Sequence, residues 1–180
     1  MRFRRTRHGI EAKVDDVEVR LLQQLTAELL TLLDAGPAGR DADPLEAIVG
    51  LPAVGAEPEL PADPALARLF PDAYPDDDGA AREFRRFTES DLRAAKSAAA
   101  RTVLDTLDGT AGRVVLDEPA AEAWLTTLND LRLTLGTRLG VTEDTDLEHL
   151  DPNDPDGQAL SVYSWLGWTQ ETLVAALAPG

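Results

Sequence analysis

Apolar side chains recur at helical spacing along much of the chain. Between Trp124 and Gly140 an apolar residue returns every three or four positions, which places these side chains on one stripe of a helix. The same spacing predicts a central helix from Val17 to Leu33 and a final helix over 159–177. A short helix is predicted to begin at Asp63-Pro64 and to stop at Pro71.

The stretch from Ala80 to Leu107 also has helical spacing, as one helix or as two. Thr88 has the character of an N-cap that splits it, because Asp91 follows at the position of a capping box. After Gly140, Thr142 is predicted to cap a further short acidic helix.

Alternating apolar and polar residues predict a small sheet. Residues 1–14 suit two short strands around a turn at His8-Gly9, and Arg113–Leu116 suits a third strand that pairs with this hairpin. The predicted fold class is therefore mostly α. It is a compact helical bundle with a small antiparallel β element, formed by the N-terminal hairpin and the short strand near 113–116.

The length of 180 residues and the hydrophobic content of 43% allow one domain with a substantial core. We therefore predict a single domain over 1–180. Its central pair is Val17–Leu33 and Trp124–Leu139, with the final helix packed against both, because these three have the widest apolar faces. Residues 36–62 are rich in Pro, Gly, Ala and acids without a clear period, and are predicted to form a flexible surface excursion.

The helix after Trp124 carries polar groups without local partners. Asp130 and Arg132 have no opposite charge three or four residues away, and Gly136 interrupts the pattern at a cost of about 1 kcal/mol relative to Ala. We predict that this helix is contacted on more than one side. A second helix crosses closely at Gly136, and ion-pair partners come from elsewhere in the fold. The available partners are Glu83, Arg85 and Arg86.

The chain is strongly acidic, with 17 Lys and Arg against 33 Asp and Glu and a net charge of −16. Phosphate backbones repel such a chain unless its cations cluster. The absence of cysteine excludes disulfides, thiolate metal sites and thiol redox switches within the chain. No apolar run approaches the roughly 18 residues of a membrane span. The basic N-terminus lacks the apolar segment of a signal peptide, so a cytoplasmic protein without membrane contact is expected.

No motif for catalysis, cofactor binding or metal binding is complete. GLPAVGAE has P-loop glycine spacing, but Ala56-Glu57 stand where Lys and Ser/Thr are required. DPNDPDG resembles a calcium loop in composition only, since its turn glycine would place Pro152 and Tyr163 at ligand positions. We therefore predict no catalytic residue, no metal, no cofactor and no enzymatic activity.

The candidate contact residues are cations and one tryptophan. Trp165 lies on the apolar face of the final helix and is assigned to the core, whereas Trp168 is rotated away from that face. The alternative for the arginines is ion pairing within the molecule. One contiguous basic face formed by the N-terminal hairpin and Arg85-Arg86 would favour a transcriptional regulator, and scattered, paired arginines would favour an adaptor or scaffold without a nucleic-acid role. The candidates for nucleic-acid or partner contact are Arg2, Arg4, Arg5, Arg85, Arg86 and Trp168.

Four segments, taken in order, resemble a known family. They are DPALARLFPDAYPDD, EFRRFTESDLRAAK, WLTTLNDLRLTLGTRLG and VYSWLGWTQETLVAAL. Together they resemble the actinobacterial AosR-type oxidative-stress transcriptional regulators, a family long known as a domain of unknown function. The resemblance covers nearly the whole chain, and LNDLRLTLGTRLG is its specific core.

The resemblance implies a regulator of genes for cysteine supply and oxidative defence, acting through protein contacts with a sigma factor or RNA polymerase. DNA contact is expected to be weak if it is direct. Family members tend to be encoded beside the protease adaptor ClpS, which implies the alternative of a non-enzymatic adaptor or scaffold in proteolysis. Redox sensing in the family relies on a cysteine pair, so sensing is either absent here or resides in a partner. Whether the chain forms a homodimer stays open.

We predict that peroxide does not switch this chain directly. Without a thiol, the readily oxidised side chain is that of Met1. Mild peroxide should leave the circular dichroism and the partner affinity of the purified protein unchanged, with added mass confined to Met1. A reversible change in affinity while Met1 is unaltered would contradict this expectation.

Overall fold

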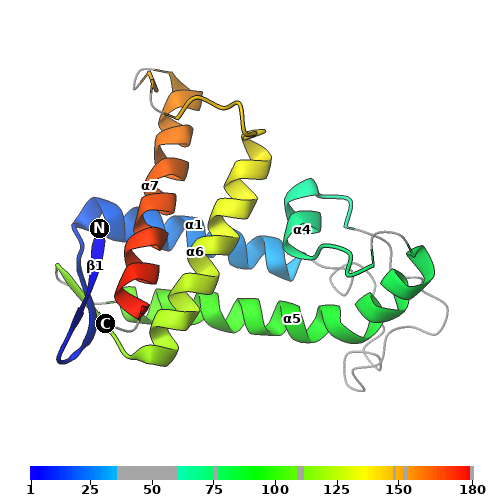
Figure 1. Ribbon diagram of the computed structural model, residues 1–180, viewed down its shortest axis with the longest axis horizontal. Helices are drawn as coiled ribbons and strands as arrows, with labels where there is room; N and C mark the ends of the chain where they lie inside the picture. The colour runs from blue at the N-terminus through cyan, green and yellow to red at the C-terminus, as the bar shows by residue number, and fades with distance from the viewer. Residues whose placement is uncertain (36–60, 75–76, 109–111, 148, 152–153, 179–180) are drawn as a thin grey trace.

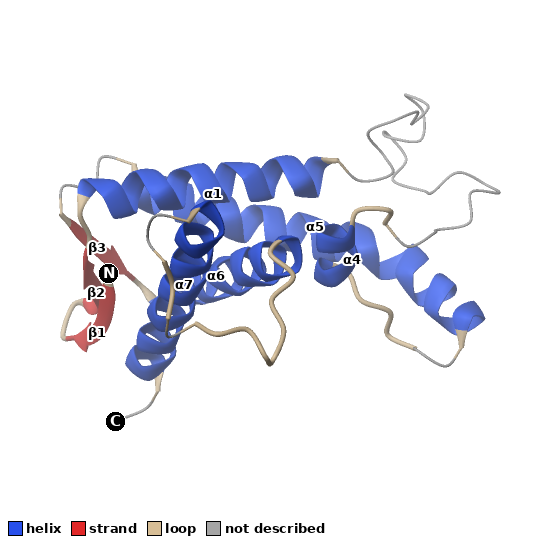
Figure 2. Ribbon diagram, turned by 90° about the horizontal axis from the view of Figure 1, so that it is seen from above, coloured by secondary structure: helices blue, strands red, loops and turns tan. Residues whose placement is uncertain are grey.

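The computed structural model describes residues 1–35, 61–74, 77–108, 112–147, 149–151 and 154–178. In these ranges the fold is mostly α, as predicted, with five helices and one three-stranded sheet. The helices are α1 (Asp16–Asp34), α4 (Pro64–Leu69), α5 (Asp78–Leu107), α6 (Glu118–Arg138) and α7 (Pro155–Leu177). Helices α1 and α5 lie along one another, and α6 and α7 form a hairpin that crosses them (Figures 1 and 2).

The sheet confirms the predicted hairpin and its third strand. Strands β1 (Arg2–Thr6), β2 (Gly9–Lys13) and β3 (Arg113–Leu116) are antiparallel in the order β1-β2-β3, with Phe3 opposite Ala12 and Ile10 opposite Leu116. The sheet lies where α1 begins and where α5 and α7 end (Figure 1). Its inward side chains join the core, because alternate residues of a strand face the same side. These are Phe3, Ile10, Ala12, Val114 and Leu116.

Helix α1 begins at Asp16, one residue before the predicted start at Val17, because Asp15 caps it. The Asp15 side chain accepts from the backbone N–H groups of Val17 and Glu18, and Glu18 returns a bond to the Asp15 N–H, which completes a capping box. The helix buries Leu22, Leu29 and Leu33, whereas Val17 at its start is exposed.

Helix α6 is central, but its main partners are α5 and α7. We predicted α1 as the other half of the central pair. Instead, α1 packs mostly on α5 and meets α6 over a smaller area. Trp124 of α6 is fully buried, and its ring meets Phe3 edge-on at 5.5 Å between centroids. Its indole Nε1 donates to Thr106 Oγ1 of α5 over 2.8 Å.

The predicted split of the 80–107 stretch is wrong, because α5 is continuous from Asp78 to Leu107. Asp77 is its N-cap, and the Thr88 hydroxyl donates to the Phe84 carbonyl one turn back instead of capping a new helix. Such back-bonding is compatible with an uninterrupted helix and often bends it. The N-terminal part of α5 turns away from the line of the rest in both views (Figures 1 and 2).

The short acidic helix predicted after Thr142 is also absent from the described residues between α6 and α7. Gly140 ends α6 at φ 63°, and the N–H groups of Gly140 and Val141 bond to the carbonyls of Thr137 and Gly136 in a Schellman arrangement. The Thr142 N–H then bonds to Thr145 Oγ1 within a turn. This stretch is too short and too polar to offset the cost of helix nucleation.

Three other predictions about the chain's path have different outcomes. Helix α4 begins at Pro64, as expected, and it buries Leu66, Leu69 and the following Phe70, whereas Tyr74 is exposed. Helix α7 begins at Pro155, four residues before the predicted start, because Asp154 caps it and Pro suits its first turn. Of the excursion predicted over 36–62, residues 36–60 lie outside the described part of the chain.

Gly9 and Gly140 both have positive φ angles, but they differ in the space around them. Gly9 has a φ of 119°, and a Cβ there would lie 2.5 Å from the Leu116 carbonyl oxygen of β3. Gly140 has a φ of 63°, and a Cβ there would meet nothing within 4 Å. Gly140→Ala should therefore lower the free energy of unfolding by about 1–2 kcal/mol. Gly9→Ala should lower it by more, because it adds a clash within the sheet to the backbone strain.

Urea unfolding followed by tryptophan fluorescence measures both changes. Equal losses in the two variants would contradict the assigned clash at the edge of β3.

Candidate functional site

The N-terminal arginines lie on both faces of β1. Arg5 lies on the same face of β1 as Phe3 and is exposed, and its Nε and Nη2 donate to the carbonyls of Ala176 and Leu177 over 2.9 and 3.0 Å. It thereby satisfies carbonyls that the end of α7 leaves without intrahelical partners. Arg2 and Arg4 are exposed, and Arg4 Nη2 lies 3.8 Å from Glu11 Oε2. Of the three predicted contact cations, Arg5 is therefore a structural residue.

Glu11 is a buried acid beneath these cations. Burial alone would raise the pKa of Glu11, but hydrogen bonds from Thr6 and Arg113, with the charges of Arg113 and Arg4, outweigh it and lower that pKa. Arg113 of β3 pairs with the same carboxylate. Part of the basic charge of the sheet is thus engaged within the molecule.

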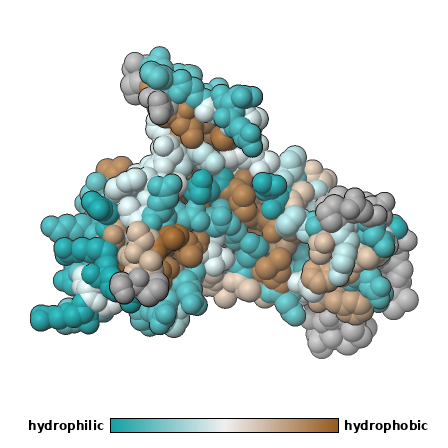
Figure 3. Space-filling view, in the orientation of Figure 1, coloured by the Kyte–Doolittle hydropathy of each residue, from teal (hydrophilic) through white to brown (hydrophobic). Residues whose placement is uncertain are grey.

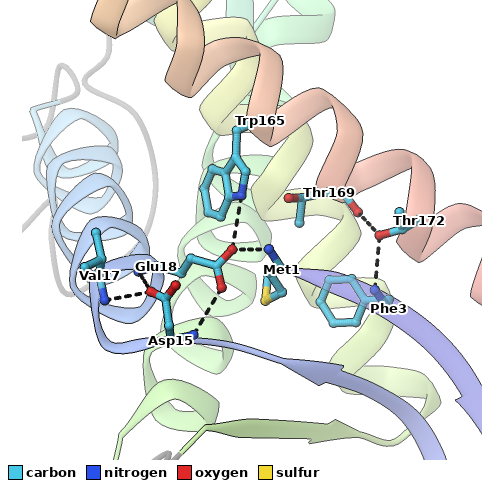
Figure 4. Close-up of polar contacts among 8 residues, drawn as sticks. All are labelled: Met1, Phe3, Asp15, Val17, Glu18, Trp165, Thr169 and Thr172. Atoms are coloured by element: carbon cyan, nitrogen blue, oxygen red, sulfur yellow. Dashed lines mark hydrogen bonds and ion pairs between the residues drawn. The ribbon is translucent and has the colours of Figure 1, made fainter. Parts of the chain in front are cut away.

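A second polar contact ties α1 to α7 (Figure 4). Glu18 accepts from the Trp165 indole over 3.3 Å and pairs with the amino group of Met1. Alongside it, the Phe3 N–H donates to Thr172 Oγ1 over 3.2 Å. Trp165 therefore serves packing, as predicted, and its one polar atom has a partner in α1.

Asp130 of α6 is paired with Lys96 of α5. Lys96 Nζ lies 2.6 Å from Asp130 Oδ1, and the Asp130 side chain is only 1% exposed. Among the described residues Asp130 Oδ2 has no hydrogen-bond partner. Burial raises the pKa of Asp130, and the hydrogen bond and charge of Lys96 oppose this rise only in part.

Arg132 points to the other neighbour of α6. Its Nη1 donates to Gln170 Oε1 of α7 over 2.8 Å, and its guanidinium lies 5.5 Å from the centre of the Tyr163 ring. The same ring lies over Gly136, where a Cβ would be 3.0 Å from Tyr163 Cε2. A large side chain on α7 thus occupies the space that Gly136 leaves.

The partners predicted for the polar groups of α6 are wrong in identity. Glu83, Arg85 and Arg86 lie near the start of α5, roughly three turns or more from the level of Asp130. The acid pairs instead with Lys96, which was not among the predicted partners. Arg132 bonds to an amide, so no search for opposite charges could have found it.

Two of the arginines in the first half of α5 are engaged within the molecule. Arg85 is buried and pairs with Asp72, and Arg93 pairs with Glu89, donates to the Leu33 carbonyl and lies 4.5 Å above the Phe70 ring. Arg86 is exposed and lies 5.8 Å from the centre of the neighbouring Phe87 ring. This part of α5 and the N-terminal sheet lie at opposite ends of the molecule (Figure 1). The predicted cations therefore do not form one contiguous basic face.

The start of α5 also carries an exposed apolar surface that sequence reasoning missed. Phe87 is 67% exposed, and Phe84, Leu92 and Tyr74 are nearly half exposed. Figure 3 shows apolar surface at this end of the molecule. The signal was available in the helical spacing of Phe84, Thr88 and Leu92. Trp168 of α7, the predicted exposed aromatic, is 45% exposed.

The described residues contain no group of three or more His, Cys, Asp or Glu side chains placed to hold a metal ion. None of the described helices is long and apolar enough to cross a membrane.

Comparison with known proteins gives one family. Residues 1–177 match the Domain of unknown function (DUF2017). The chain is 39% identical to a protein of Mycobacterium leprae (strain TN) that carries the name AosR. It is 36% identical to the Oxidative stress regulator AosR of Mycobacterium bovis (strain ATCC BAA-935 / AF2122/97) and of Mycobacterium tuberculosis (strain ATCC 25618 / H37Rv). Each match covers 89% of this chain and 78% of the relative. No solved structure matches the chain.

The buried pair between α5 and α6 predicts a pH-dependent defect. Lys96→Met leaves the Asp130 carboxylate buried without its counter-charge and should lower the free energy of unfolding by about 3–5 kcal/mol near neutral pH. Because the pKa of Asp130 is raised in the folded state, folding gains stability as pH falls through the interval between the folded and unfolded values. Removing Lys96 raises the pKa of Asp130 in the folded state further. Acidification should therefore reduce the difference in free energy of unfolding between the variant and the parent protein.

Urea unfolding of both proteins across a pH series measures that gap. The control is Lys96→Met combined with Asp130→Leu, which should recover much of the loss because no buried charge remains. A gap that does not change with pH would show that the loss comes from packing.

Proposed function

We propose that this chain, which belongs to the AosR-type family, regulates the response to oxidative stress through contacts with other proteins. The domain of this family, DUF2017, covers residues 1–177. The relatives' names support the oxidative-stress role. The placement of the arginines supports the proposed contacts with other proteins. Arg85 is buried in an ion pair, Arg5 is exposed but bonded to the end of α7, and the remaining candidates are split between the two ends of the molecule.

The proposed partners are a sigma factor or RNA polymerase, and the proposed target genes serve cysteine supply and oxidative defence. Both follow from the family resemblance. A protein of net charge −16 is repelled by duplex DNA at long range. It can reach a promoter most readily through a partner that binds DNA itself. Arg2, Arg4 and Arg86, which are exposed, remain proposed contacts for nucleic acid, and Trp168 remains a proposed contact for a partner protein.

A second candidate is an adaptor or scaffold linked to ClpS-type proteolysis. The same scattered, paired arginines support it, since such a role requires no nucleic-acid surface. It requires an exposed apolar contact instead. Trp168 offers one, and the other predicted candidate, Leu45–Leu51, lies outside the described residues.

Reconstitution separates the two candidates. Purified chain is mixed with core RNA polymerase, with each alternative sigma factor of the source cell and with ClpS, and complexes are measured by biolayer interferometry. The regulator proposal expects saturable binding to polymerase or to one sigma factor and a change in transcript yield in vitro. Binding to ClpS alone, with no effect on transcription, would establish the adaptor instead.

Direct DNA binding should be weak. We expect duplex DNA alone to bind non-specifically, with a dissociation constant in the range of about 10⁻⁴ to 10⁻⁶ M at physiological salt. Arg2→Ala with Arg4→Ala should remove most of this binding and leave the partner affinity unchanged. Arg5→Ala is the matched control for charge, and its expected effect includes fraying of the end of α7. Tight, sequence-specific binding by the isolated chain at about 150 mM salt would contradict the proposal.

A further inference from the structure

The outer face of the three-stranded sheet carries a row of cations. Alternate residues of a strand face the same side, so Arg2 and Arg4 of β1 lie on the face opposite Phe3, which enters the core. In the register of the sheet, Arg2 is opposite Lys13, and Lys13 is opposite Arg113. All three of these residues are exposed. One cation from each strand thus lies beside the next across the whole sheet.

The neighbouring row of the same face contains a buried acid between two arginines. Arg4 is opposite Glu11, and Glu11 is opposite Val115. The Glu11 carboxylate accepts from Thr6 Oγ1 over 3.0 Å and pairs with both Arg4 and Arg113. Glu11 is 5% exposed, whereas the Arg4 and Arg113 side chains are 71% and 54% exposed. The acid therefore lies beneath the two arginines and leaves them accessible from outside.

The charges on this face are not balanced within the described part of the chain. We name Arg2, Arg4, Lys13 and Arg113 the basic face. Glu11 is the only acid in the three strands, so four cations and one acid leave a net charge of +3 on a chain of net charge −16. Neither Arg2 nor Lys13 forms an ion pair with another described residue. Like charges directly opposite one another destabilise a sheet, and a bound anion would remove this repulsion.

The composition of the basic face favours phosphates over a protein segment as the anion. Val115 is its one exposed large apolar residue, and no aromatic side chain lies on this side of the strands. Protein interfaces have cores that are poor in charge and rich in aromatic residues. Single-stranded nucleic acid is bound with aromatic residues on which the bases stack. An exposed row of cations without either feature suits the backbone of a duplex.

The spacing of the row also suits a duplex. Neighbouring strands lie about 4.8 Å apart, so the row from Arg2 to Arg113 spans roughly 10 Å. Duplex DNA presents about one negative charge per 1.7 Å of its axis, and several phosphates therefore fall within that span. The guanidinium fork of arginine matches the oxygens of a phosphate. Hydrophilic surface extends over the end of the molecule where the sheet lies (Figures 1 and 3).

We infer that the basic face binds the phosphates of duplex DNA without reading the sequence. Lys13 and Arg113 thereby join Arg2 and Arg4 in one contact surface, and Glu11 holds Arg4 and Arg113 in place beneath it. The surface is too small to overcome the repulsion of the whole chain at long range. It acts once the proposed protein partner has brought the chain to a promoter, and in this respect the inference rests on the proposed function.

The test measures how salt changes the affinity of the full chain for DNA. The chain is titrated into a fluorescein-labelled duplex of about 20 base pairs of arbitrary sequence, between about 50 and 200 mM salt, and binding is followed by anisotropy. Four phosphate contacts should give a plot of log K against log salt with a slope of about −3 to −4. A second duplex of different sequence should give the same slope and the same affinity.

Lys13→Gln is the deciding variant, because Lys13 has no ion pair among the described residues to lose. It should reduce the magnitude of the slope by about one. It should also leave the urea midpoint unchanged or raise it, since one repulsive row member is gone. The matched control is Arg68→Gln, which removes an exposed arginine on α4 at the other end of the molecule (Figure 1) and should leave the slope unchanged.

Three results would overturn the inference. An unchanged slope in Lys13→Gln would show that the basic face does not contact the duplex. A lower urea midpoint together with an unchanged slope would make Lys13 a structural residue. Displacement of the duplex by poly-L-glutamate as readily as by unlabelled DNA of equal charge would identify an acidic protein segment as the occupant. Binding to polymerase or to a sigma factor is measured without DNA, so the proposed function is judged separately.

Discussion

Trp124 joins the parts of the fold that are far apart in sequence. It is fully buried, its ring meets Phe3 of the sheet, and its indole donates to Thr106 of α5. A tryptophan in this position contributes a large apolar area and one polar atom that must find a partner. The sheet, α5 and α6 can therefore close only in the arrangement that satisfies both. Helix α7 then packs on α6 and on β1.

The polar residues of α6 select this arrangement rather than adding stability to it. A buried ion pair such as Lys96–Asp130 gains little over apolar residues of the same size, because both charges lose their hydration. A wrong register, however, would leave the Asp130 carboxylate buried alone, at a much larger cost. On the opposite side, Arg132 and Gly136 match Gln170 and Tyr163 of α7. We regard the two contacts as devices that fix which helix lies on which side of α6.

The arginines of this acidic chain also connect separate parts of the fold. Arg5 satisfies the end of α7, Arg85 holds the residues after α4, and Arg93 links α5 to the end of α1. Cations that could have formed a nucleic-acid surface instead connect helices. Arg2, Arg4 and Arg86 remain exposed, together with apolar side chains at the start of α5 and on α7. Gathered apolar side chains at a surface are typical of protein contacts, and they support the proposed contacts with other proteins.

The sequence by itself determined the local structure. The helix start at Asp63-Pro64, the hairpin turn at Gly9 and the apolar spacing of α1, α6 and α7 could all be predicted, because each depends on residues a few positions apart. Where local signals conflicted, as at Thr88 and Thr142, the prediction failed. Only the tertiary structure decided that Lys96 pairs with Asp130, that Gln170 meets Arg132, and that Arg85 is buried while Arg86 stays exposed. Those pairings depend on how helices cross, and the packing of side chains distant in sequence sets that crossing.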